Sequence, residues 1–96
     1  MKNKSRTEIV VQILEVAKKG YADGQREGRD GGLNLTELKD KIFLGDAQLQ
    51  EYLVLLIEGD LLYYDLDTQT FKITEKGAIF LQCYDAIDQE LKEHDA

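Results

Sequence analysis

Two short stretches with helical periodicity lie back to back in the middle of the chain and meet at Gly45. Thr36 is placed to cap the first helix, whose inward face carries Leu38, Ile42 and Phe43. Asp46 is placed to cap the second, which ends at Gly59 and whose apolar stripe consists of Leu49, Tyr52, Leu53 and Leu56. Because a turn of only about two residues joins the two helices, the pattern predicts a helix-turn-helix over residues 36–59.

The N-terminal segment predicts an amphipathic helix followed by a loop. Ser5 and Glu8 have the spacing of a capping box, in which each side chain accepts a hydrogen bond from the backbone amide of the other residue. Apolar residues at helical spacing then predict a helix over residues 6–19, with Gly20 as its stop. Five glycines among polar residues predict a flexible loop over residues 20–32.

The remaining segments predict short strands and a last helix. Leu33 and Leu35 alternate as in a short strand, and residues 61–73 contain two β-rich runs around a polar turn. Thr74 is placed to cap a helix over residues 74–92. The order helix, strand, helix, helix, hairpin, helix is that of a winged helix-turn-helix. This is a mostly helical α+β fold whose hairpin is the wing.

Length and composition indicate the class of protein. The 96 residues fit a single domain over 1–96, and a content of 43% hydrophobic and 32% charged residues is typical of a globular protein. The longest aliphatic run, residues 53–57, is far shorter than the roughly 20 residues of a membrane-spanning helix. The N-terminus has no apolar stretch of the kind found in secretory signals, and a single cysteine excludes an intrachain disulfide. We therefore expect a cytoplasmic protein that does not bind membranes.

The net charge of −7 is unevenly distributed along the chain. Residues 1–30 carry seven Lys/Arg against five Asp/Glu, a net charge of +2, whereas residues 31–96 carry five against fourteen, a net charge of −9. Since cationic side chains bind the phosphates of DNA, the acidic segment opposes DNA binding. Any contact with DNA is therefore expected to depend on a small set of basic residues.

Five short motifs, in this order, resemble a known family. They are residues 5–10 (SRTEIV), 47–53 (AQLQEYL), 57–62 (IEGDLL), 74–77 (TEKG) and 80–81 (FL). They resemble the archaeal winged helix-turn-helix DNA-binding family, which includes small dimeric chromatin proteins, and the likeness covers nearly the whole chain outside the glycine-rich loop. The resemblance implies a winged helix, a dimer formed by a C-terminal coiled-coil helix, and DNA binding through the helix-turn-helix and wing. The chain departs from the family at Gln50, where relatives tend to carry lysine, and in its shorter last helix.

The second helix of a helix-turn-helix is the one that enters the major groove of DNA. Gln48 and Gln50 of this helix carry amides that match the hydrogen-bonding edge of adenine. Contacts with phosphate are assigned to four basic residues, Arg6, Lys39, Lys41 and Lys72. The leading hypothesis is therefore a transcriptional regulator or architectural chromatin-type factor that binds double-stranded DNA through these six residues.

The last predicted helix has the apolar pattern of a dimerisation helix. Its seam has the period of a coiled coil and consists of Phe80, Tyr84, Ile87 and Leu91. The flanking stripe, which is expected to cover the domain, consists of Ile79, Cys83 and Ala86. Because a domain of this size cannot bury both stripes, we expect a homodimer with the seam as its interface.

A second hypothesis is an acidic protein-interaction module that does not bind DNA. Glu51 and Glu58 lie on the outward face of the second helix and repel phosphate. On the same helix Val54 and Leu55 offer apolar surface to another protein.

Catalysis is not expected from this sequence. The paired carboxylates Asp65 with Asp67 and Asp85 with Asp88 fit an ordinary solvated surface, and no nucleophile has an evident base. No metal site and no cofactor are expected, because the chain has one histidine and one cysteine and lacks the glycine motifs that hold phosphate.

Overall fold

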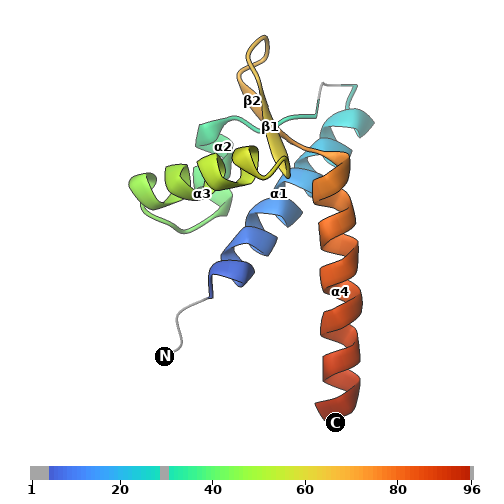
Figure 1. Cartoon of the computed structure of the whole chain (residues 1–96). Helices are drawn as coiled ribbons and strands as arrows, with labels where there is room; N and C mark the ends of the chain where they lie inside the picture. The colour runs from blue at the N-terminus through green and yellow to red at the C-terminus, as the bar shows by residue number, and fades with distance from the viewer. Residues whose placement is uncertain (1–4, 29–30, 96) are drawn as a thin grey trace.

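The structure is a computed structural model that describes residues 5–28 and 31–95. Within these ranges the chain forms four helices and a two-stranded antiparallel sheet, so the predicted mostly helical α+β class is confirmed. The elements are α1 (Arg6–Arg26), α2 (Leu35–Lys41), α3 (Asp46–Glu58), β1 (Leu62–Asp65), β2 (Thr70–Ile73) and α4 (Glu75–Asp95). The hairpin of β1 and β2 projects from one end of the molecule, and α4 runs toward the other (Figure 1).

Helix α1 begins as predicted and ends later than predicted. The capping box is present, with the Glu8 amide donating to Ser5 Oγ and the Ser5 amide donating to Glu8 Oε1, each at 3.2 Å. The helix continues through Gly20 to Arg26, so the prediction of a loop from residue 20 is wrong for its first seven positions. Gly28, with φ of +77°, follows the C-cap and is the left-handed glycine that was expected at Gly20.

Close backbone packing explains why glycines occur inside α1. A Cβ on Gly24 would overlap the Cα of Gly31, so at this point the helix and the following segment pack backbone against backbone. Each glycine costs the helix about 1 kcal/mol relative to alanine, and the packing of α1 against residues 31–33 offsets that cost. Helix propensity alone therefore disfavours a helix at these glycines. The packing that offsets this cost joins α1 to residues 31–33, and only the structure shows it.

The N-cap of helix α2 lies two residues before the expected cap. Asn34, not Thr36, is the N-cap, and it forms a capping box in which the Glu37 amide donates to Asn34 Oδ1 at 2.8 Å. The preceding residue Leu33 pairs with Phe71 of β2, whereas Leu35 is already helical. The expected short strand is therefore a single bridge, because the capping box starts the helix immediately after it.

The connection between α2 and α3 is longer than predicted. Residues 42–45 separate the two helices, rather than a turn of about two residues around Gly45. Ile42 is buried as expected, but the side chain of Phe43 is 91% exposed, so its predicted inward position is wrong. The backbone of Ile42, the C-cap of α2, is extended, so the side chain of the next residue, Phe43, points away from the core. Gly45, not Asp46, is the N-cap of α3 and makes no side-chain capping bond.

The hairpin and the start of α4 agree with the predictions. Leu62 of β1 pairs with Ile73 of β2, and Tyr64 pairs with Phe71. Thr74 caps α4, since its Oγ1 accepts a hydrogen bond from the Gly77 amide at 3.0 Å and donates one to the Asp60 carbonyl at 2.6 Å. The hydroxyl of Thr74 thereby connects the end of α3 to the beginning of α4.

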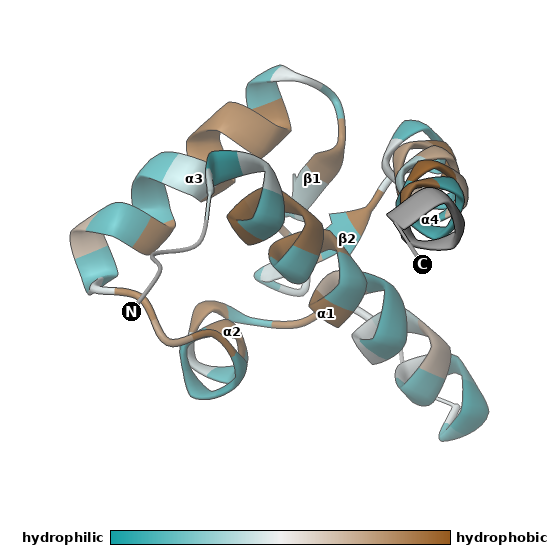
Figure 2. Cartoon of the chain, turned by 90° about the horizontal axis from the view of Figure 1, so that it is seen from below, coloured by the Kyte–Doolittle hydropathy of each residue, from teal (hydrophilic) through white to brown (hydrophobic). Residues whose placement is uncertain are grey.

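The core lies where α1, α2, α3, the hairpin and the first turns of α4 meet. The stripe of α3 is buried as predicted, and Gly59 ends that helix. The side chains with almost no exposure are Ile13, Leu14, Leu38, Ile42, Leu49, Leu56, Leu62 and Leu81. Seen from below, α4 lies to one side of the other helices (Figure 2). The core therefore covers only part of the length of α4.

Candidate functional site

The six residues predicted to contact DNA lie in different environments. Arg6, Lys41, Gln48 and Gln50 are exposed. Lys39 is only partly exposed, and its Nζ lies 3.2 Å from Asp46 Oδ2 at the first turn of α3. The sixth residue, Lys72, is buried. The exposed cations among the six are therefore Arg6 on α1 and Lys41 on α2, and the hairpin offers none.

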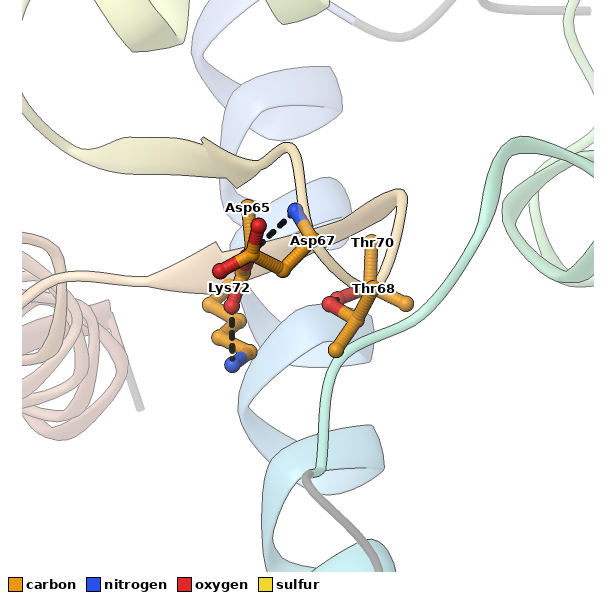
Figure 3. Close-up of polar contacts among 5 residues, drawn as sticks. All are labelled: Asp65, Asp67, Thr68, Thr70 and Lys72. Carbon is orange, nitrogen blue, oxygen red and sulfur yellow. Dashed lines mark hydrogen bonds and ion pairs between the residues drawn. The ribbon is translucent and has the colours of Figure 1, made fainter.

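Lys72 is unavailable to phosphate, which corrects the predicted contact. Its side chain is 8% exposed, and its Nζ donates to Asp65 Oδ2 at 2.9 Å (Figure 3). The ammonium also lies 5.9 Å from the ring centroid of Tyr63. Alternate residues of a strand face opposite sides, and position 72 lies on the side of the hairpin that faces the domain. Lysine is rarely buried without a partner, and here Asp65 is that partner.

The Lys72 ammonium lowers the pKa of the Asp65 carboxyl, chiefly through the hydrogen bond between them, and partial burial of the carboxyl opposes this effect. The Asp67 amide also donates to Asp65, at 2.9 Å. Because the pKa is lower in the folded state, the pair stabilises the fold at pH values above the ordinary carboxyl pKa of about 3.9. That contribution is lost as the pH falls through the folded-state pKa.

A Lys72→Met variant should therefore be less sensitive to acid than the wild type. The methionine retains an unbranched stem but cannot hold the carboxylate in its charged form. We expect the free energy of unfolding in urea to fall less between about pH 5 and pH 3 in the variant than in the wild type. Lys76→Met, at an exposed position, is the control and should behave as the wild type does. Equal acid sensitivity of all three proteins would contradict the role of this pair.

The outer face of α3 and the hairpin is acidic. Residues 46–73 carry six Asp/Glu and a single basic residue, which is the buried Lys72. The exposed acids on α3 include Glu51 and Glu58, two helical turns apart and thus on one side. No exposed lysine or arginine occurs within this segment, residues 46–73, all of which the structure describes.

The same face carries a groove between α3 and the hairpin, with a volume of about 680 Å³. Its apolar lining consists of Leu35, Leu53, Val54, Ile57, Tyr64 and Phe71. Its polar lining is uncharged and consists of Asn34, Thr36, Gln50 and Gln69. The rings of Tyr64 and Phe71 pack against each other with centroids 4.8 Å apart, so they form a continuous aromatic wall. The groove is thus apolar inside and has no cation in its lining.

A second, shallower hollow of about 530 Å³ adjoins the groove. It shares Gln50 and Val54 with the groove and adds Ala47, Glu51 and Leu55. The side chain of Val54 is 54% exposed and that of Leu55 55%, as expected for the protein-interaction hypothesis. The apolar surface therefore extends across the outward side of α3.

The sequence did not reveal this groove. The sequence predicts apolar surface at Val54 but assigns Leu35 to a strand. It does not indicate that Tyr64 and Phe71 lie beside α3. Their alternation along β1 and β2 places them on one face of the sheet, which is a usable signal. The sequence does not indicate where that face lies relative to α3.

On α4 the two apolar stripes do not divide between the domain and a partner as predicted. Phe80 and Tyr84 pack against the core of their own domain, so they are not free to form a dimer seam. The flanking residues Ile79, Cys83 and Ala86 are exposed instead of covering the domain. Ile87 and Leu91, also assigned to the seam, are exposed to 60% and 59%. The exposed apolar stripe of α4 thus consists of Ile79, Cys83, Ala86, Ile87 and Leu91.

A scan against protein-family models finds no matching family, and no curated protein matches the chain. The likeness to the archaeal winged-helix family accordingly depends on the quoted motifs alone. In the described residues, no helix is both long enough and apolar enough to cross a membrane.

Proposed function

We propose that this chain is a homodimeric winged-helix protein that binds another protein through the face formed by α3 and the hairpin. The order of elements supports the winged-helix assignment: α1, the Leu33 bridge, α2, α3, the hairpin and α4. In this arrangement α3 corresponds to the recognition helix and the hairpin to the wing. Together they form the face with which such domains meet their ligands.

The proposal is based on the negative charge and the exposed apolar surface of that face. DNA binding draws most of its affinity from cations that neutralise phosphates, and residues 46–73 offer six acids and one buried lysine. Approach of this face to a polyanion is therefore repulsive. Exposed Val54 and Leu55 and the adjoining groove provide instead an apolar patch rimmed by polar residues, which is typical of a protein-interaction site.

The homodimer is supported by the exposed stripe of α4. An isolated helix with this much apolar surface is stabilised by packing against a second copy. Ile79, Ile87 and Leu91 are each more than half exposed. Figure 1 shows that the distal part of α4 extends beyond the other helices, so a second copy has access to it.

DNA binding is the second candidate function. It is favoured by exposed Gln48 and Gln50 on the N-terminal half of α3, the part that contacts bases in this fold. Arg6, Lys39 and Lys41 supply cations from α1 and α2. Three such contacts in each of two subunits predict that the binding constant falls with salt at a logarithmic slope of about −5.

Fluorescence anisotropy with labelled duplex DNA at about 50 and 200 mM salt separates the two functions. Our proposal predicts no saturable binding at the lower salt concentration. Binding that saturates there, weakens steeply at the higher concentration and is lost in a Lys39→Ala/Lys41→Ala variant would establish the DNA-binding function instead. A matched Lys18→Ala/Lys19→Ala variant, changed on α1, controls for the loss of two charges.

A further inference from the structure

The groove between α3 and the hairpin has a shape that suits one kind of ligand. Its walls are side chains: Val54 and Ile57 from α3 on one side, and the paired rings of Tyr64 and Phe71 on the other. Leu53 is largely buried beneath them. A peptide that adds a strand to a sheet needs a free backbone edge, whereas a helix needs an apolar groove of side chains. The lining therefore favours a helix.

The charge around the groove restricts the ligand further. Glu51 borders the adjoining hollow, and Glu58 lies two turns further along α3 on the same side. A second copy of this chain, with net charge −7, would bring more negative charge to this face. Like charges placed opposite each other across an interface disfavour binding, so the complementary ligand is cationic.

We propose that the groove holds a single amphipathic helix of a partner protein, with apolar residues on one side and Lys or Arg along its flank. The inference rests on the proposed docking function and specifies the chemistry of the partner. Apolar side chains at successive turns of the ligand helix fill the space between Ile57 and Phe71, and its cations meet Glu51 and Glu58. Gln50 and Gln69, which line the groove, are available to hydrogen-bond polar groups of the ligand.

A labelled amphipathic peptide of leucine and lysine, 18 residues in length, is a suitable probe, with a leucine and glutamate peptide of the same pattern as its counterpart. We expect the Leu/Lys peptide to bind the full chain saturably and the Leu/Glu peptide to bind at least tenfold more weakly. Val54→Lys introduces a charge into the groove at an exposed position and should weaken binding of the Leu/Lys peptide at least tenfold. Ala22→Lys adds the same charge on an exposed part of α1 outside the groove and should change binding less than twofold.

Three results would overturn the inference. Equal weakening by Val54→Lys and Ala22→Lys would show that overall charge, not the groove, holds the peptide. No binding of the Leu/Lys peptide would remove the amphipathic helix as ligand. Tighter binding of the Leu/Glu peptide than of the Leu/Lys peptide, lost in Val54→Lys, would show that the partner is not cationic. The docking function would then still hold. Salt-sensitive DNA binding by the wild type, in contrast, would overturn the docking function itself.

Discussion

An Ile87→Asp variant is expected to sediment as a single chain at concentrations where the wild type sediments as a dimer. The side chain of Ile87 is 60% exposed in one chain and lies in the middle of the exposed stripe of α4. In the proposed dimer it is buried against a second copy, and a carboxylate buried there without a partner is strongly unfavourable. The dissociation constant of the dimer should rise at least about 100-fold, which corresponds to about 2.7 kcal/mol.

Sedimentation equilibrium or light scattering over a concentration series measures this effect. Gln89→Asp is the matched control, because Gln89 is exposed on α4, lies away from the stripe and gains the same charge. The control should remain dimeric. A wild-type mass of one chain at about 100 μM, where a complex with a micromolar dissociation constant is formed, would contradict the proposed dimer, as would an unchanged mass for Ile87→Asp.

Replacing Gly77 with alanine is expected to destabilise the fold by about 2–3 kcal/mol, because an added Cβ forces the packed backbone apart. Alanine normally stabilises a helix relative to glycine by about 1 kcal/mol, so the expected sign is opposite to that of helix propensity. The reason is local: a Cβ at position 77 would overlap the carbonyl oxygen of Leu61, and Gly77 is buried against that backbone. The glycine thus allows the first turn of α4 to contact the segment between α3 and β1.

Urea unfolding of wild type and variant at one protein concentration measures the effect, since the stability of a dimer depends on concentration. Gly45→Ala is the control, because no atom lies within 4 Å of a Cβ built there. It should cost only about 1 kcal/mol or less, the typical effect of losing a favourable N-cap residue. A Gly77→Ala variant that is more stable than the wild type would show that α4 does not approach Leu61 this closely.

Most of the secondary structure followed from apolar periodicity and capping residues. The capping box at Ser5, the stripe of α3 and the Thr74 cap of α4 are where the sequence predicts them. One error arose because glycine was treated only as a helix stop. Gly20 and Gly24 lie inside α1 because neighbouring residues pack directly against them. Such contacts join segments that are distant along the chain, and a local pattern does not contain them.

The candidate site was less predictable than the fold. The exposure of Val54 and Leu55 followed from the helical period of α3, but the groove beside them depends on how the hairpin packs. Lys72 was assigned to phosphate because charged residues are usually solvated, and its pairing with Asp65 across the hairpin was not anticipated. The sequence predicts two apolar stripes on α4. Which residues pack against the core depends on how α4 is rotated about its own axis, and the sequence does not determine that rotation.

We propose that the α3–hairpin face excludes DNA because it is acidic. The most direct test repeats the DNA titration at about 50 mM salt with a Glu51→Lys/Glu58→Lys variant beside the wild type. Our account predicts no saturable binding by the wild type and salt-sensitive binding by the variant, whose recognition helix is then cationic. Saturable binding by the wild type, with an affinity equal to that of the variant, would contradict it.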